Sequence, residues 1–355
     1  MPTTATCLKV PKSQGERTIA LANKLGLIDK SLGIARDATF LCIPLVRQLE
    51  VHELALESQM PQIEVTTSSF TEKASPTLTL TQTLQDMLPP HLLEVLPQAF
   101  DIIGDIVIVD IPPELKPHEK AIGEAILKTH KNIRTVLAKA GDVSGTYRIR
   151  NYAFIAGEHK TQTIHKEFGC IFHVDVARAY FSPRLSHEHE RVASLVQSGE
   201  TIVDLFAGVG PFSVLIAKKN PRVKVYAVDL NPDAVELLKL NVRVNRVDNR
   251  VFLILADARQ IAQTKLKGTA DRVIMNLPET AIDFVDAACQ ALKPQGGIIH
   301  FYAFIRSPDT TENLKQRFTE VVEKAGRKVE LFTYAKSIRE TAPFESQVVL
   351  DAKVA

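Results

Sequence analysis

The chain has 355 residues, 45% of them hydrophobic and 24% charged, and its formal net charge is +2. These values are typical of a globular protein of two or three domains, and the lack of any run of about 18 apolar residues excludes a membrane span. The four cysteines are scattered without a Cys-x-x-Cys pair, so we expect no metal site, no disulfides and a cytoplasmic location. Residues 1–14 contain no apolar core of a signal peptide.

Residues 1–62 predict a small N-terminal αβ domain. Residues 7–10 and 39–45 have the apolar character of strands, and residues 13–25 have helical spacing. Residues 63–82 are rich in Thr, Ser, Gln and Pro and contain little that could form a core, so we expect a linker there.

An α+β middle domain is expected over residues 83–186. Residues 100–111 form one apolar run and predict a buried strand, and residues 118–128 have the spacing of a helix. Further strands are expected at residues 148–154, 161–166 and 170–176.

The middle of the chain is basic. Between residues 116 and 166, ten Lys or Arg residues stand against four Asp or Glu residues, and four histidines lie in the same stretch. Such an excess attracts polyanions, so it indicates either a nucleic-acid-binding face or an ordinary solvated charged face.

From residue 187 to residue 355 the pattern alternates between strands and helices. Seven strands are expected, at residues 201–205, 223–229, 251–255, 271–276, 296–303, 328–334 and 346–352. Asn231 and Pro232 provide the N-cap and first position of a helix that runs to about Val244. Strands joined by crossover helices predict an α/β domain with a doubly wound, Rossmann-like, mostly parallel seven-stranded sheet.

A glycine loop follows the first of these strands. Asp204 ends the strand, Gly208 and Gly210 form a tight turn, and Pro211 opens a helix. This arrangement is typical of a nucleotide-type cofactor site. Ser213 stands where dinucleotide-binding loops have a third glycine, and no Walker lysine is present, so the loop favours a cofactor with an adenosine and no phosphate.

Polar residues follow the next three strands. Asp229 stands where an acid holds ribose hydroxyls, and Asp257 could accept a hydrogen bond from an adenine amine, although both could also simply cap helices. Asn276 and Pro278 form an Asn-x-Pro at the end of the fourth strand. The amide oxygen of Asn276 could accept an N–H of a substrate base, or the pair could form an ordinary turn.

Together these residues resemble class I S-adenosylmethionine methyltransferases, and more narrowly the archaeal and eukaryotic tRNA guanine-37 N1-methyltransferases in their three-domain archaeal form. The segments that carry the resemblance are 147–150, 156–158, 163–167, 180–185, 204–212, 229–232, 276–278 and 300–302. The similarity is clear from about residue 95 onward and looser in the N-terminal module and linker.

The resemblance implies methyl transfer from S-adenosylmethionine to N1 of guanosine 37, the nucleotide 3′ of the anticodon. It implies that Glu188 removes the N1 proton, that Arg148 stabilises the charge on O6, and that Asn276 holds the amino edge of guanine. Without the resemblance, Glu188 would be interpreted as an acid in the first turn of a helix, and Arg148 as a phosphate-binding or surface residue. The implied cofactor residues are Tyr180, Arg184, His189, Asp204, Phe206, Ala207, Gly208, Gly210, Asp229, Leu230, Asp257, Ala258, Asn276 and Pro278.

The expected partner is tRNA, gripped at its anticodon stem-loop by the basic middle domain and at its tertiary core by the N-terminal domain. We expect a monomer that needs no metal and binds no membrane. One alternative is a wyosine-pathway enzyme, which would add a C-methyl or aminocarboxypropyl group to the modified guanosine 37 or catalyse both reactions. A more distant alternative is an NAD-dependent dehydrogenase.

Overall fold

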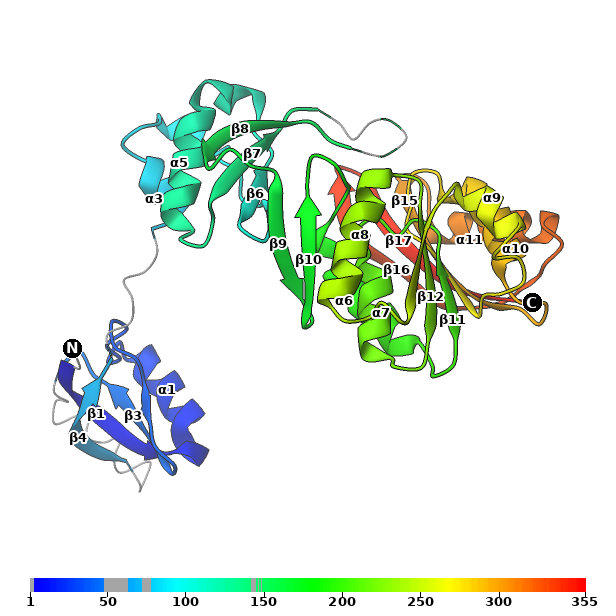
Figure 1. Cartoon of the computed structure of the whole chain (residues 1–355). Coiled ribbons are helices and arrows are strands. Elements are labelled where there is room, and N and C mark those ends of the chain that lie inside the picture. The colour runs from blue at the N-terminus through cyan, green and yellow to red at the C-terminus, as the bar shows by residue number, and fades with distance from the viewer. Residues whose placement is uncertain (1–2, 48–62, 72–77, 142–144, 146, 148) are drawn as a thin grey trace. The chain divides into compact units, whose positions relative to one another are not determined.

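The computed structural model describes residues 3–47, 63–71, 78–141, 145, 147 and 149–355. The chain forms two compact units, Met1–Gln82 and Thr83–Ala355, which are considered separately (Figure 1). Across the described ranges, none of the helices combines the length and apolarity that a bilayer crossing requires. Nor do these ranges contain three or more His, Cys, Asp or Glu side chains gathered as metal ligands.

The first unit is an antiparallel sheet with a helix packed on it. Its strands are β1 (Thr3–Pro11), β2 (Ala35–Arg36), β3 (Phe40–Pro44) and β4 (Glu64–Phe70), in the order β2-β3-β1-β4. The helix α1 (Gly15–Lys24) follows a 3₁₀ turn (Lys12–Gln14) and contributes Ala22 to a core with Leu8, Val10, Leu27 and Ile43.

Strand β4 corrects the predicted linker. Residues 63–82 were expected to be a linker, yet Glu64–Phe70 pairs with Thr3–Lys9 of β1 and buries Phe70. The Thr and Ser residues of this segment suit a strand, because β-branched and alternating polar residues fit a half-buried sheet edge. Residues 72–77 of the predicted linker lie outside the described part of the chain.

The second unit begins with a four-stranded sheet in the order β5-β6-β7-β8. Its elements are α3 (Leu80–Leu84), α4 (Pro90–Leu93), β5 (Asp101–Ile103), β6 (Ile106–Val109), a 3₁₀ helix (Pro113–His118), α5 (Glu119–Thr129), β7 (Thr135–Lys139) and β8 (Tyr152–Gly157). The division between the two units falls inside α3.

The apolar run at residues 100–111 is a hairpin and not one strand. It turns at Gly104, which has φ +58°, so that Ile103 pairs with Ile106. Gly104 also packs closely, because a Cβ there would lie 2.1 Å from Oγ1 of Thr163. The prediction of one strand with polar interruptions is therefore wrong: Gly104 and Asp105 form a turn, whereas an isolated glycine in a strand pattern can also mark a bulge within one strand.

A second hairpin leads into the large sheet. It consists of β9 (Gln162–Glu167) and β10 (Cys170–Asp175). A 3₁₀ helix (Pro183–Leu185) and α6 (Ser186–Leu195) come after β10. The backbone of β10 is held by the amides of Asn241 and Asn245 on α8 (Pro232–Val244) and just after it. The predicted boundary at residues 186 and 187 therefore does not separate two compact units.

The seven-stranded sheet has the order β13-β12-β11-β14-β15-β17-β16. Its strands are β11 (Thr201–Asp204), β12 (Lys224–Asp229), β13 (Val251–Leu255), β14 (Arg272–Met275), β15 (Gly297–Arg306), β16 (Val329–Ala342) and β17 (Glu345–Val354). The first five in chain order are parallel, and β17 lies antiparallel between β15 and β16. This confirms the predicted Rossmann-like sheet.

Helices cover both faces of this sheet (Figure 1). The remaining helices are α7 (Pro211–Lys219), α9 (Ala258–Gln263), a 3₁₀ helix (Ala281–Phe284), α10 (Val285–Ala291) and α11 (Thr311–Lys324). Side chains alternate along β11, so Ile202 packs into the core beneath α6, α7 and α8, whereas Val203 packs into the core beneath α9, α10 and α11. The strand order reverses at β11 and β14, where ligands bind in such sheets.

Candidate active site

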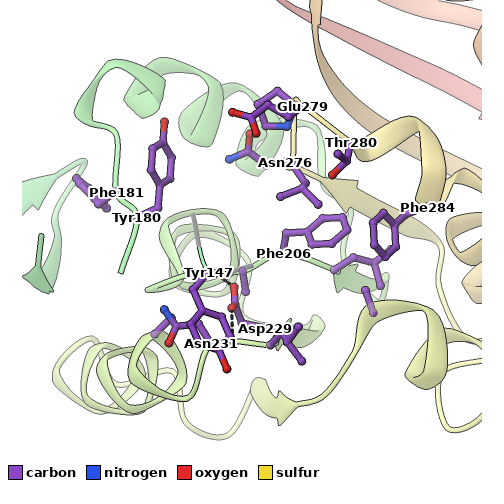
Figure 2. A pocket seen from close by; sticks show the side chains of 18 of the residues that line it. Tyr147, Tyr180, Phe181, Phe206, Asp229, Asn231, Asn276, Glu279, Thr280 and Phe284 are labelled. Atoms are coloured by element: carbon purple, nitrogen blue, oxygen red, sulfur yellow. Dashed lines mark hydrogen bonds between the residues drawn. The ribbon is translucent and has the colours of Figure 1, made fainter. Parts of the chain in front are cut away.

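A cavity of about 390 Å³ opens at the carboxyl ends of β11, β12 and β14 and beside the residues that follow β13. Figure 2 shows Asn276 and Glu279 on one side of it and Asp229 with Asn231 on the opposite side. This edge of the sheet gathers residues that are far apart in sequence, because these four parallel strands all end there.

Asp229 anchors the glycine loop. One carboxylate oxygen accepts from the backbone N–H of Gly208 at 2.6 Å, and the other accepts from the N–H of Asn231 at 2.9 Å. Burial raises the pKa of this carboxyl group, and the backbone donors oppose the rise. The side chain lines the cavity, and each oxygen has a further lone pair that could accept from a ribose hydroxyl.

Asp204 and Gly210, both predicted as cofactor residues, support the loop and do not line the cavity. Asp204 is fully buried and accepts from Oγ of Ser213 at 2.7 Å. Burial raises the pKa of Asp204 to about 7. Gly210 has φ +91°, and a Cβ there would lie 2.3 Å from Cδ1 of Leu238. Ser213, the residue in place of a third glycine, thus ties the helix start to the strand beneath it.

Part of the apolar wall of the cavity is an aromatic pair, Phe206 and Phe284. Their rings are in contact edge to face, with centroids 5.2 Å apart. Asp257 also lines the cavity and caps α9 by accepting from the N–H of Gln260 at 3.0 Å, so the capping and cavity positions coexist. An apolar wall with carboxylates in the same cavity suits an adenosine, whose base is flat and whose sugar and amine are hydrogen-bond donors.

Asn276 presents an unsatisfied acceptor to the cavity. Its Oδ1 is buried and has no hydrogen-bond partner among the described residues. An unpaired buried acceptor costs free energy of about 1–3 kcal/mol, which a ligand N–H would recover. Pro278 fixes the turn that follows, and its carbonyl accepts from the N–H of Phe304 at 3.0 Å.

The predicted general base, Glu188, is not among the residues that line the cavity. Its buried carboxylate accepts from Nε of Arg191 at 3.1 and 3.0 Å, from Nη2 of Arg191 at 2.9 Å, and from the hydroxyl of Tyr302 at 3.1 Å. Acting as a base would therefore require the carboxylate to leave Arg191.

Arg191 also binds a second buried acid on another element. Its Nη1 donates to Asp351 of β17 at 2.5 Å, and Asp351 pairs with Nδ1 of His300 at 2.7 Å. Burial alone would raise the pKa of Asp351, but His300 and Arg191 lower it to about 2. The Glu188 carboxylate is thus held by a network that spans α6, β15 and β17.

His189 lines the cavity, and a buried carboxylate holds its ring. Nδ1 of His189 lies 2.7 Å from Oε1 of Glu167, and its ring packs edge-on against Phe212. Burial would raise the pKa of Glu167, but the neighbouring imidazoles of His165 and His189 lower it to about 2. Glu167 therefore orients the ring that faces the cavity.

Tyr180 lines the cavity, whereas Arg184 does not. Nε of Arg184 is paired with Asp101 of β5, and the residue lines a neighbouring cavity of about 470 Å³. Arg184 thus lies outside the cavity in an ion pair with the middle sheet, and its cofactor role stays a prediction. Arg148 lies outside the described residues.

The cavity brings together most of the predicted cofactor residues. Those that line it are Tyr180, His189, Phe206, Ala207, Gly208, Asp229, Leu230, Asp257, Ala258, Asn276 and Pro278. The lining residues that the sequence did not predict as cofactor residues are Gly145, Tyr147, Phe181, Ser182, Leu185, Leu205, Pro211, Asn231, Ala234, Ala256, Leu277, Glu279, Thr280 and Phe284. Asn231 and Leu277 sit inside the predicted motifs, so adjacency could have found them, whereas Phe284 lies in a short 3₁₀ helix without a recognisable pattern.

No Lys or Arg among the described residues lines this cavity, which disfavours a cofactor with a pyrophosphate. The glycine loop, the acids after two neighbouring strands and the Asn-x-Pro after a third instead define a class I S-adenosylmethionine-dependent methyltransferase. The chain belongs to the TRM5/TYW2 methyltransferase family. The TRM5/TYW2 methyltransferase domain matches residues 163–332, the TYW2 N-terminal domain matches residues 80–161, and the tRNA methyltransferase 5 N-terminal domain matches residues 7–53.

The tRNA (guanine(37)-N(1))-methyltransferase Trm5b of Pyrococcus abyssi is 39% identical over 347 residues, which cover 98% of each chain. Its crystal structure superposes with a TM-score of 0.74 at 37% identity and covers 99% of both chains. A complex of aTrm5 and tRNALeu superposes with a TM-score of 0.69 at 32% identity, covering 98% of this chain and 99% of the other.

Relatives with a different reaction are also similar. The tRNA 4-demethylwyosine(37)-methyltransferase Taw21 of Saccharolobus solfataricus is 36% identical over 255 residues, covering 71% of this chain and 92% of its own length. A structure of M. jannaschii TYW2 in complex with AdoMet has a TM-score of 0.56 at 30% identity and covers 72% of this chain and 99% of that one.

Proposed function

We propose that this chain transfers a methyl group from S-adenosylmethionine to N1 of guanosine 37 in tRNA. The observation that carries the proposal is the cavity itself. Asp229 and Asp257 line it and can accept hydrogen bonds from an adenosine, and the unpaired Oδ1 of Asn276 lies in the same cavity. Membership in a family with tRNA guanine-37 relatives supports the substrate.

The residues present fit S-adenosylmethionine. The apolar wall formed by Phe206 and Phe284 can pack against the adenine, Asp257 can accept from its amine, and Asp229 can accept from the ribose hydroxyls. When bound, the cofactor supplies an electrophilic methyl group on a sulfonium. The chain supplies position and orientation, which is the main requirement of a direct displacement.

The N1 atom of guanine carries a proton that must leave. Asn276 can orient the base by accepting from its amino edge, since Oδ1 lacks another donor among the described residues. Glu188 can take the proton once substrate entry draws its carboxylate away from Arg191, and Arg148 would stabilise the charge that develops on O6. The roles of Glu188 and Arg148 rest on the family resemblance.

The tRNA would be gripped by both units. The basic stretch between residues 116 and 166 lies mostly in the middle sheet and its connections, where phosphates could bind. Met1–Gln82 would read tRNA tertiary shape, and guanosine 37 would leave its stack to enter the cavity, at a cost of a few kcal/mol. We further propose that the protein acts as a cytoplasmic monomer.

A product assay tests the function and separates the alternatives. The protein is incubated with tRNA bearing guanosine 37 and with S-adenosylmethionine labelled either on the methyl group or on the carboxyl carbon, and the tRNA is then digested to nucleosides. We expect methyl label in 1-methylguanosine and no carboxyl label in RNA. Carboxyl label in RNA would instead demonstrate aminocarboxypropyl transfer, and methyl label seen only with tRNA carrying 4-demethylwyosine would place the chain with the C-methylating relatives.

A further inference from the structure

A cavity of about 360 Å³ lies on the middle sheet, outside the cofactor site. Its walls come from β7, β8 and the connection between β8 and β9, and we refer to it as the outer cavity. The residues that matter most for its chemistry are Arg150, Tyr152, Phe154, His159 and Lys160. No Asp or Glu among the described residues lines it.

The outer cavity combines an aromatic platform with cations. Phe154 is 36% exposed although it lies in a strand, and its ring centroid is 4.8 Å from that of His159. Arg150 forms no ion pair with any described residue, whereas Lys160 is paired with Asp105 and Glu158. An exposed ring beside an uncompensated guanidinium suits a nucleobase with its phosphate, because bases stack on aromatic faces while cations bind the backbone.

The backbone of β8 is shaped for this exposure. The register between β7 and β8 shifts so that Val136 pairs with Ala156 but Leu137 pairs with Phe154, leaving Ile155 as an extra residue. Ile155 and Ala156 are both buried in succession. Such a bulge re-aims the neighbouring side chains, and bulges are frequent next to binding sites.

The outer cavity connects to the cofactor cavity through a third one. The intermediate cavity of about 470 Å³ shares Arg150 and Tyr152 with the outer cavity and shares Tyr180, Phe181, Ser182 and Glu279 with the cofactor cavity. Lys139, Arg306 and Arg339 also line the intermediate cavity. The three cavities therefore adjoin one another between β8 and the carboxyl edge of the large sheet. Among the described residues that line them, the outer cavity has cations, the intermediate cavity has both cations and the acids Asp101, Glu279 and Glu345, and the cofactor cavity has acids but no Lys or Arg.

We propose that the outer cavity binds a nucleotide that flanks guanosine 37, stacking its base on Phe154 and binding its phosphate at Arg150. The inference rests on the proposed function, because it takes guanosine 37 as the occupant of the cofactor cavity. Binding the flanking nucleotide outside the base stack of the anticodon loop would offset part of the free-energy cost of extruding guanosine 37.

A double-mutant cycle between protein and RNA tests this assignment. The full chain and Phe154→Ala are compared for binding to three tRNA transcripts by fluorescence anisotropy: unmodified, abasic at position 36, and abasic at position 38. We expect Phe154→Ala to weaken binding of the unmodified transcript by about 5- to 100-fold, the usual effect of removing a stacking platform. With one of the abasic transcripts, the variant and the parent should bind equally.

Three controls accompany the cycle. Phe252→Ala removes a similarly exposed phenylalanine from β13, an edge strand of the large sheet. This variant should leave tRNA binding unchanged. Arg150→Ala should lower the slope of log affinity against log salt by about one, whereas Arg222→Ala should not. Calorimetric affinity for S-adenosylmethionine reports whether Phe154→Ala is folded, and His159→Ala provides a second variant on the connecting loop.

Loss of binding that is the same for all three transcripts would overturn the assignment, as would unchanged binding by both Phe154→Ala and His159→Ala. Because these measurements record binding and not methylation, they remain separate from the proposed function. A parent protein that binds tRNA and shows the coupling, but forms no 1-methylguanosine, would overturn the proposed function alone.

Discussion

At the scale of single residues, the carboxylate of Asp229 has two roles. It fixes the glycine loop and the start of α8 through backbone N–H groups, and it faces the proposed ribose site. We expect Asp229→Ala to weaken S-adenosylmethionine binding by about 10- to 100-fold, since hydrogen bonds to a charged group each contribute about 1.5–3 kcal/mol. Isothermal calorimetry measures this effect. Asp248→Ala, at an exposed position after α8, should bind like the parent.

Glu188 provides the second prediction at this scale. Glu188→Gln keeps the shape of the side chain but removes the base, so we expect single-turnover methylation to slow by about 100-fold or more while affinity for tRNA changes little. The matched control is Glu190→Gln, two residues further along α6, whose side chain pairs with Lys219. Turnover equal to that of the parent in Glu188→Gln would remove Glu188 from the mechanism.

The cavity positions of Gly208, Asp229 and Asp257 were predictable because they are local. Each lies at or shortly after the carboxyl end of a strand, so chain position alone places them at one sheet edge. The environment of Glu188 was not predictable, because it depends on Tyr302 of β15 and, through Arg191, on Asp351 of β17. The ion pair of Arg184 was not predictable for the same reason, since its partner Asp101 comes from another sheet.

At the scale of elements, Asp351 joins β17 to α6 and β15. We expect Asp351→Asn to lower the free energy of unfolding of the second unit at pH 7 by about 3–5 kcal/mol, because Arg191 would lose one of the two buried carboxylates that it binds. Urea denaturation followed by circular dichroism measures this loss. Asp309→Asn, at an exposed ion pair with Arg317, should cost about 1 kcal/mol or less.

The contacts of Asp351 with Arg191 and His300 also predict a pH dependence of the free energy of unfolding. The pKa of Asp351 is about 2 in the folded chain and 3.8 in its ordinary state, so its stabilising effect is complete above pH 4 and is lost as pH falls through about 2. The parent should lose about 2 kcal/mol from this source in that window. Asp351→Asn should show a correspondingly shallower decline between pH 4 and pH 2, and equal slopes would contradict the ion-pair network.

The strands of the large sheet were largely predictable, since each is a short apolar run between helical patterns. The full strand order was not predictable. β17 lies between β15 and β16, and nothing in the sequence of a strand identifies the strands that pair with it. Strand β4 was missed because its Thr- and Ser-rich segment carries no apolar periodicity and depends on β1 for pairing.

At the scale of the whole molecule, the cofactor cavity draws all its walls from the second unit. We expect a fragment of residues 83–355 to bind S-adenosylmethionine with the affinity of the full chain and to methylate tRNA with a kcat/KM reduced by about tenfold or more, because phosphate and shape contacts from the first unit are lost. Calorimetry and steady-state methylation measure the two quantities. Equal kcat/KM would show that Met1–Gln82 has no part in tRNA recognition.

The placement of β17 leaves β16 at the outer edge of the large sheet, where within the described residues it pairs with β17 alone. The free side of an edge strand has unpaired backbone N–H and C=O groups, which can pair with a strand of another molecule and so begin aggregation. Charged side chains at Glu330, Lys336, Arg339 and Glu340 discourage such pairing.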